Sequence, residues 1–126
     1  MKTPIISVID DDESSRVSIQ SLLRSLGYAV HAFSSAQAFL QSGVAPTSSC
    51  IISDIQMPGM DGLALQAQLR ASGSKVPIIF ITAFYNPATE ARAKKGGALC
   101  VLQKPFDSDL LLQCLADALK TGSANP

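Results

Sequence analysis

The chain has 126 residues and a formal net charge of zero; 47% of its residues are hydrophobic and 16% are charged. This length and composition predict one domain with a core of ordinary size and exclude a disordered chain. The neutral charge argues against nucleic-acid binding by this chain alone, because neutralising phosphates requires a basic surface. No apolar run reaches the ~18 residues of a membrane span, and the first residues do not resemble a signal peptide.

The three cysteines, Cys50, Cys100 and Cys114, are odd in number and widely spaced, and all three lie in apolar surroundings. Disulfide frameworks are typical of secreted proteins with an even set of cysteines. We therefore expect buried, reduced thiols in a cytoplasmic protein.

Short apolar runs alternate with helical patterns in the first half of the chain. The β-branched run Ile5–Ile9 predicts a buried strand. A helical pattern follows, ends at Gly27, and carries leucine and isoleucine at i, i+3, i+4 and i+7, namely Ile19, Leu22, Leu23 and Leu26. The next expected elements are a strand over Tyr28–Phe33, a short helix over Ser35–Gln41 and a strand over Cys50–Asp54.

The second half repeats this alternation. We expect a helix over Gly62–Ala71 with Leu65 and Leu69 inward, a strand over Val76–Thr82, a helix over Ala88–Lys95 and a strand over Leu99–Gln103. Asn86 and Pro87 fit an N-cap followed by proline at the first helical position. Asp107 is expected to cap a last helix with an apolar stripe of Leu111, Cys114, Leu115, Ala118 and Leu119, before a polar tail over 121–126.

Five strands alternating with five helices predict an α/β fold with a parallel sheet covered on both faces. In such open sheets, ligands bind at the carboxyl ends of the strands. Chemically distinctive residues follow four of the predicted strands: Asp10 and Asp11, Asp54, Thr82, and Lys104. We therefore expect these side chains to lie at one edge of the sheet.

Three carboxylates without histidine or cysteine make a hard oxygen site suited to Mg²⁺ or Mn²⁺. Clustered carboxylates repel one another unless a divalent cation or the Lys104 ammonium offsets their charge. A cation and an ammonium beside Asp54 would also stabilise charge on a phosphoryl group in transfer, with the carboxylate as nucleophile.

The motifs, taken in order, resemble the receiver domain of two-component response regulators. They are the acidic pair Asp10-Asp11, Asp-x-x-Met-Pro-Gly-x-x-Gly from Asp54, Ile-Thr-Ala from Ile81, and Lys-Pro-Phe from Lys104. The resemblance covers about residues 5 to 120, and it is greatest to the nitrogen-fixation branch, whose receivers often precede a helix-turn-helix domain. It implies a flavodoxin-like (βα)5 fold with strand order 2-1-3-4-5, and a receiver domain over residues 1–120.

The resemblance also implies the roles of the acidic residues. Asp54 would accept a phosphoryl group from a phosphohistidine of a sensor histidine kinase, or from a small phosphodonor. Asp11, Asp54 and the backbone carbonyl of Gln56 would bind Mg²⁺ directly, whereas Asp10 would act mostly through water. The domain would catalyse its own phosphorylation and dephosphorylation and would not be an enzyme with external turnover.

The remaining site residues would bind the phosphoryl group. The Thr82 hydroxyl and the Ala83 backbone N–H would donate hydrogen bonds to it, and Lys104 would pair with its charge. The resemblance implies a cis peptide bond between Lys104 and Pro105, which is accessible because proline lowers the cost of the cis form.

Several other polar residues have structural explanations. Asp12 and Glu13 fit charges at a helix start, where the helix dipole favours acids. Asp61 is an ordinary turn residue. His31 lies within a predicted strand, away from the acidic edge, and we expect it to be structural or exposed.

One position departs from the family pattern. Receivers usually carry tyrosine or phenylalanine three residues before the lysine, where this chain has Val101. Valine has a stiff side chain and no ring that could swing inward. We therefore expect Phe84, Tyr85 and the helix ending at Lys95 to carry the conformational switch, and we expect Phe84 to shield the phosphoryl group from water.

Two alternatives remain, and a third is excluded. One is an interaction module that keeps the receiver fold and works without phosphate. Another is a haloacid-dehalogenase-type phosphatase with a nucleophile in the acidic cluster at Asp10. A nucleotide-binding flavodoxin-like protein is set aside, because no Gly-rich or Ser/Thr-rich phosphate loop follows the first strand.

The expected partners are a sensor histidine kinase, an output domain that is either attached or separate, and a second copy of the chain in a phosphorylation-dependent dimer. The tail over 121–126 is expected to be either a terminus or the start of a linker. No membrane partner is expected.

Overall fold

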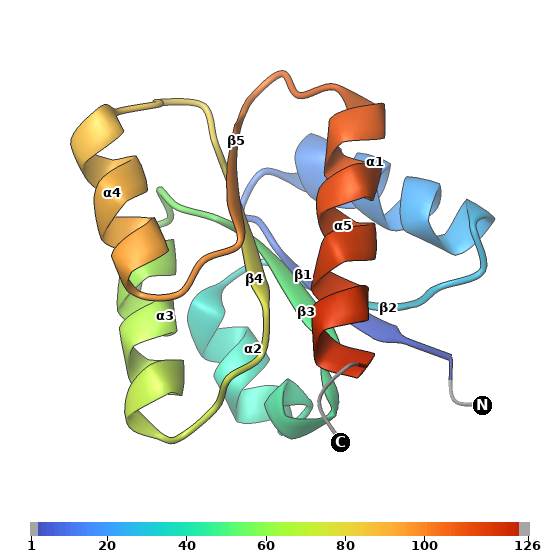
Figure 1. The fold of residues 1–126 in the computed structure, drawn as a ribbon, viewed down its shortest axis with the longest axis horizontal. Coiled ribbons are helices and arrows are strands. Elements are labelled where there is room, and N and C mark those ends of the chain that lie inside the picture. Colours follow the sequence, from blue (N-terminus) through green and yellow to red (C-terminus); the bar gives the residue numbers. More distant parts are fainter. Residues whose placement is uncertain (1–2, 124–126) are drawn as a thin grey trace.

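The computed structural model describes residues 3–123, with the side chains of residues 3–120. Its strands are β1 (Ile5–Ile9), β2 (Ala29–Phe33), β3 (Cys50–Asp54), β4 (Ile78–Thr82) and β5 (Cys100–Gln103). Its helices are α1 (Glu13–Ser25), α2 (Ala36–Ser42), α3 (Gly62–Ala71), α4 (Pro87–Lys95) and α5 (Ser108–Ser123), with a 3-10 turn, η1, over Ala45–Thr47. Strands and helices alternate as predicted (Figure 1).

The five strands form one parallel sheet in the order β2-β1-β3-β4-β5. This confirms the predicted flavodoxin-like arrangement. In the register, Ile9 lies opposite Ser53, Asp54 opposite Ile81, and Thr82 opposite Gln103. The ends of β1, β3, β4 and β5 therefore meet at one edge of the sheet.

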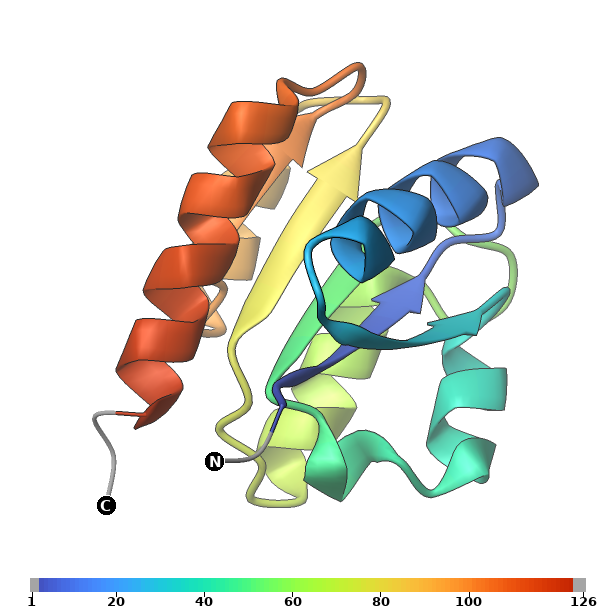
Figure 2. The ribbon, with the colours of Figure 1, turned by 90° about the vertical axis from the view of Figure 1, so that its right-hand side faces the viewer.

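Helices cover both faces of the sheet (Figures 1 and 2). On one face, α1 and α5 pack against alternate strand residues, with Ile19 and Leu23 of α1 and Leu111, Cys114, Leu115 and Ala118 of α5 buried. On the other face, α2, α3 and α4 bury Phe39, Leu65, Leu69 and Ala93 against Ile51, Ile78 and Phe80. The predicted inward residues of α3 and α5 are confirmed; Leu119 is only partly buried.

The predicted boundaries differ from the structure by one or two residues in most elements, and more at the end of α5. β2, β4 and β5 begin later than expected. The Leu99 amide, just before β5, still donates to the Ile78 carbonyl, and the Ile51 amide donates to the carbonyl of Pro77, just before β4. Leu26 was expected in the apolar stripe of α1, and this was wrong: it is the C-cap and is 51% exposed, because the helix has already ended.

The end of α5 was also predicted too early. The helix continues through Ser123, so the polar tail expected over 121–126 starts as helix. Residues 124–126 lie outside the described residues. The sequence 108–123 contains no proline, and its single glycine, Gly122, stands in the last turn, so nothing ends the helix at residue 120.

Side-chain caps mark the starts of the helices. Asp12, Ser35, Asp61 and Asn86 each accept a hydrogen bond from an amide in the first turn of the helix that follows. The Asp107 carboxylate likewise accepts from the Asp109 amide, at 2.9 Å. These bonds satisfy amides that have no partner within the helix. They confirm the predicted roles of Asn86 and Asp107 and the interpretation of Asp12 as a helix-start charge.

The cysteines are free, as expected, with Cys50 and Cys114 buried and Cys100 partly buried. Burial raises the pKa of Cys50 to about 12, and burial together with a hydrogen bond to Cys114 raises the pKa of Cys100 to about 12. These two thiols therefore stay protonated near neutral pH. Within residues 3–123, no helix combines the length and apolar character needed to cross a bilayer.

Candidate functional site

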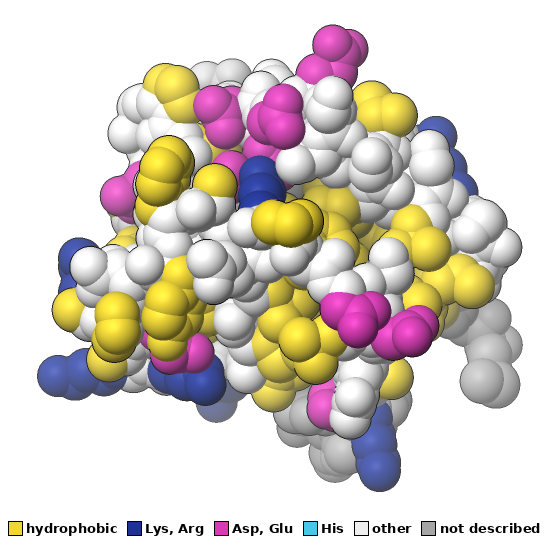
Figure 3. All heavy atoms as spheres, turned by 90° about the horizontal axis from the view of Figure 1, so that it is seen from above, with side chains coloured by type: hydrophobic (Ala, Val, Ile, Leu, Met, Phe, Trp, Pro, Cys, Tyr) yellow, Lys and Arg dark blue, Asp and Glu magenta, His cyan; other side chains and the backbone are white. Residues whose placement is uncertain are grey.

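The predicted site residues lie together where the strands end. Figure 3 looks onto this edge, where several Asp and Glu side chains gather beside a Lys or Arg side chain. Three carboxylates, those of Asp10, Asp11 and Asp54, each offer an oxygen within 4.8 Å of the others. They come from the end of β1 and the end of β3, which are neighbouring strands.

Lys104 joins two of these carboxylates. Its Nζ donates to Asp10 Oδ2 at 3.0 Å and to Asp54 Oδ2 at 3.1 Å. All three side chains are largely withdrawn from water, with Asp10 completely buried and Asp54 6% exposed. Lys104 is preceded by β5 and followed by a cis peptide bond to Pro105, as predicted. The ammonium is thus held at the acidic edge, where it offsets the charge of two buried carboxylates.

The Asp54 carboxyl is perturbed by its surroundings. Its pKa is raised from 3.8 to about 6, chiefly by burial; the Lys104 ammonium lowers this pKa and the Asp10 charge raises it. For Lys104, burial favours the neutral amine, but the hydrogen bond to Asp10 and the charges of both carboxylates dominate and raise its pKa. A titratable group shifted this far by burial and by a named charge partner marks a candidate functional site.

Close backbone packing positions Asp54. The Gly62 amide donates to the Ile55 carbonyl at 2.8 Å at the start of α3. A Cβ at Gly62 would lie 2.4 Å from the Asp54 backbone oxygen and 2.9 Å from the ring of Phe80. Only glycine therefore allows α3 to approach the end of β3 this closely, which is the physical reason for the last glycine of the motif.

Asp10 is fixed by local contacts. Its Oδ1 accepts from the Asp12 amide at 2.9 Å, and its carbonyl accepts from Arg16 Nη1 at 2.8 Å. Asp11, in contrast, is exposed at the mouth of the site. The oxygen-only donor set fits Mg²⁺ or Mn²⁺. Asp10, Asp11 and Asp54 could hold the ion. Direct binding by Asp11, Asp54 and the Gln56 carbonyl, with Asp10 acting mostly through water, stays a prediction.

The Thr82 hydroxyl is engaged on both sides. It donates to Gln56 Oε1 at 2.6 Å and accepts from the Phe84 amide at 3.0 Å. Gln56 in turn donates its backbone N–H to Asp54 Oδ1 at 3.3 Å. The sequence predicted a role only for the backbone carbonyl of Gln56, and the contact of its side chain with Thr82 was missed.

The residues expected to replace the missing aromatic are near the site but mostly in solvent. Phe84 is 72% exposed and Tyr85 is 42% exposed. The Tyr85 hydroxyl donates to Glu90 in α4, and this bond raises the pKa of Tyr85. Val101 packs against the core on the α3 and α4 side. Ala83 is exposed just after Thr82, and His31 is exposed on β2, away from the acidic edge.

A polar clamp between α3 and α4 was also missed. The buried Gln66 donates to the Ala93 carbonyl at 2.9 Å, and Arg70 Nε donates to the Gly96 carbonyl at 3.0 Å. Ala93 is the only fully buried side chain of α4. The C-terminal end of α4 is therefore held to α3 by hydrogen bonds more than by apolar contacts.

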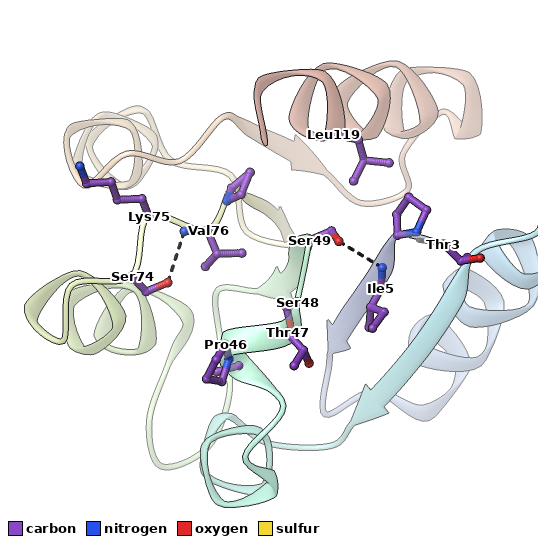
Figure 4. A pocket seen from close by; sticks show the side chains of 13 residues that line it. Thr3, Ile5, Pro46, Thr47, Ser48, Ser49, Ser74, Lys75, Val76 and Leu119 are labelled. Atoms are coloured by element: carbon purple, nitrogen blue, oxygen red, sulfur yellow. Dashed lines mark hydrogen bonds between the residues drawn. The ribbon is translucent and has the colours of Figure 1, made fainter. Parts of the chain in front are cut away.

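A hollow of about 720 Å³ lies at the opposite edge of the sheet (Figure 4). Its lining contains hydroxyls and Lys75 but no carboxylate. Two of those hydroxyls already accept backbone amides, Ser49 from Ile5 at 3.2 Å and Ser74 from Val76 at 3.3 Å. This hollow lacks the convergent free polar groups of a reactive site.

Comparison with known proteins agrees with this geometry. The family described as the response regulator receiver domain matches residues 6–116. Nodulation protein W of Bradyrhizobium diazoefficiens is 41% identical over 114 residues, which are 90% of this chain and 50% of that protein. The transcriptional regulatory protein FixJ of the same organism is 38% identical over 91% of this chain and 56% of its own length.

Solved structures agree as well. The response regulator StyR superposes with a TM-score of 0.90 at 39% identity, covering 98% of this chain and 62% of that one. The structure named FixJ-N superposes with a TM-score of 0.84 at 30% identity, covering 95% and 96%. The chain spans about half the length of the curated relatives it matches. It belongs to the response regulator receiver domain family, in the branch that includes FixJ.

Proposed function

We propose that this domain is the phosphoacceptor switch of a two-component phosphorelay and that Asp54 receives the phosphoryl group. The observation that carries the proposal is the buried Asp54 carboxylate, held 3.1 Å from the Lys104 ammonium beside two further carboxylates. Such a carboxylate is positioned as a nucleophile with a cation ready to offset the incoming charge.

In the proposed reaction, an Asp54 oxygen bonds to phosphorus while the bond between phosphorus and the donor histidine nitrogen breaks. The histidine keeps the electron pair of that bond, so only the phosphoryl group moves. Lys104, the Thr82 hydroxyl and the Ala83 amide would hold its oxygens. Asp11, Asp54 and the Gln56 carbonyl would hold Mg²⁺ directly and Asp10 would hold it mostly through water, and the ion would offset the negative charge that gathers on the transferring group.

The proposed location of this domain is the cytoplasm, and its proposed partners are a sensor histidine kinase and an output domain, attached or separate. The lengths of the curated relatives support an attached output domain, because this chain covers about half of each. Phosphorylation would change the surface presented by the Phe84–Lys95 segment, and dimerisation on phosphorylation remains part of the proposal.

Labelling with a small phosphodonor such as radiolabelled acetyl phosphate tests the assignment. The wild-type chain should take up label in the presence of Mg²⁺, and Asp54→Asn should abolish it. A phosphatase with its nucleophile at Asp10 would instead lose the label with Asp10→Asn and keep it with Asp54→Asn. Failure of the wild-type chain to take up any label would favour a phosphate-independent interaction module.

A further inference from the structure

The only hydrogen of the Thr82 hydroxyl is already engaged in a hydrogen bond. The hydroxyl donates this hydrogen to Gln56 Oε1 at 2.6 Å, and its oxygen accepts the Phe84 amide at 3.0 Å. Thr82 is 1% exposed, so water has little access to replace either partner. A hydroxyl has one donor hydrogen. Any second acceptor that needs a hydrogen bond from Thr82 must displace Gln56.

A phosphoryl group on Asp54 would be such an acceptor. The Gln56 side chain is anchored close to Asp54, since its own backbone amide donates to Asp54 Oδ1 at 3.3 Å. Gln56 therefore contacts the acceptor carboxylate through its backbone amide and the threonine through its side chain.

We propose that the Gln56 side chain is a positioning residue that holds the Thr82 hydroxyl in the resting state and competes with the phosphoryl group for its proton. The inference rests on the proposed function of Asp54. Gln56 sets how tightly the site holds a phosphoryl group, because binding must first break the bond between Thr82 and Gln56.

Breaking the bond between Gln56 and Thr82 costs the Gln56 side chain little. Gln56 is exposed, and its amide can turn to water once Thr82 leaves it. Thr82 cannot do the same from its buried position. The net worth of a partly exposed neutral hydrogen bond corresponds to a roughly 2- to 10-fold change in an equilibrium constant.

Binding of beryllofluoride, a stable mimic of a phosphoryl group on aspartate, tests the competition. The affinity of the chain for beryllofluoride is measured by calorimetry at saturating Mg²⁺. Gln56→Met removes the acceptor at similar length, and Gln56→Asn keeps an amide that is one methylene too short to reach Thr82. Both variants should bind about 2- to 10-fold tighter than the wild-type chain. Gln68→Met, at an exposed glutamine of α3, should leave the affinity unchanged.

A double-mutant cycle separates this competition from a merely local effect. In a Thr82→Val background there is no hydroxyl to compete for, so Gln56→Met should no longer change the affinity. The amide resonance of Phe84, which reports the bond to the Thr82 oxygen, should shift in Gln56→Met without beryllofluoride and stay in place in Gln68→Met.

Equal or weaker binding by both Gln56 variants, or a gain that persists with Thr82→Val, would overturn the inference and leave the proposed function intact. Tighter binding by Gln56→Met alone would also overturn it, because an apolar contact would then explain the gain. If the wild-type chain binds no beryllofluoride at all, the proposed function of Asp54 itself is wrong.

Discussion

Ionising Asp54 is unfavourable in this fold, because the carboxyl is buried and Asp10 lies beside it. The folded-state pKa, about 6, exceeds the ordinary value of 3.8. The folded protein therefore binds the Asp54 proton more tightly than the unfolded chain does. Between about pH 4 and pH 6 the free energy of unfolding of the metal-free protein should fall as the pH rises. Above about pH 6 it should fall no further, because Asp54 is then ionised in both states.

Because the pKa of Asp54 is raised on folding, Asp54→Asn should stabilise the metal-free protein at neutral pH. The neutral amide removes the repulsion from Asp10 and can still accept from Lys104. We expect a gain of about 1 kcal/mol in the free energy of unfolding at pH 7, falling to nothing near pH 4. Urea unfolding in chelator at several pH values measures it. Asp109→Asn, at an exposed carboxylate of α5, should show no such gain; a loss of stability for Asp54→Asn at pH 7 would contradict the assigned pKa direction.

Phe84 presents a different question, because it follows Thr82 by two residues yet is 72% exposed. If its ring shields the phosphoryl group from attacking water, Phe84→Ala should speed the loss of phosphate from Asp54 by a few fold. Decay of the labelled protein measures this rate. Tyr85→Phe serves as the control, since it keeps a ring and removes only the bond to Glu90. An unchanged or slower decay for Phe84→Ala would rule out shielding.

At the scale of elements, α4 buries the fewest side chains of the five helices. It buries one small side chain, Ala93, and its C-terminal end is held by Gln66 and Arg70 of α3. A segment with few apolar anchors opens at low free energy. This supports the expectation that Phe84 to Lys95 reorganises on phosphorylation, in a chain where Val101 replaces the usual ring.

The clamp on α4 can be tested by Gly96→Ala. An added Cβ would lie 2.6 Å from Gln66 Oε1, so the Gln66 amide must move and give up its bond to Ala93. We expect a loss of about 1 kcal/mol in unfolding free energy. Amide hydrogen exchange of α4 should quicken more than that of α3.

The matched control is the same change in a Gln66→Ala background. With the Gln66 side-chain amide already removed, Gly96→Ala should lower the free energy of unfolding little further, because the space that the added Cβ occupies is empty. A full loss of stability in that background would show that the clamp is not the cause.

At the scale of the whole molecule, one edge of the sheet concentrates like charge that the fold alone only partly offsets. Lys104 pairs with Asp10 and Asp54, while Asp11 stays exposed beside them. A divalent cation bound there should stabilise the native state, because the unfolded chain does not gather these carboxylates.

Mg²⁺ should therefore raise the unfolding temperature of the wild-type chain. Free Mg²⁺ at about five times its Kd would add about 1 kcal/mol to the free energy of unfolding. Asp11→Asn should weaken this response, whereas Asp109→Asn should leave it intact. Thermal unfolding in chelator and in increasing Mg²⁺ measures both. An equal response in Asp11→Asn would remove Asp11 from the ligand set.

Elements and strand ends could be predicted well from the sequence, because they depend on local patterns. The buried runs of β1 and β3 are apolar over their length, and each meets an abrupt carboxylate, so Asp10 and Asp54 could be placed at the edge without coordinates. Leu26 was misplaced because periodicity continues past the residue where the helix hydrogen bonds stop. The 3-10 turn over Ala45–Thr47 has no periodic pattern and was not predicted.

The sequence by itself determined the order of the elements, the acidic edge and the identity of its candidate residues. Only the tertiary structure decided which long-range polar contacts form: Gln56 with Thr82 across 26 residues, and Gln66 with Ala93 across 27. The reason is physical. Apolar periodicity is a property of residues close together in the sequence. A hydrogen bond between residues far apart in the sequence depends on the packing of whole strands and helices to within a few tenths of an ångström.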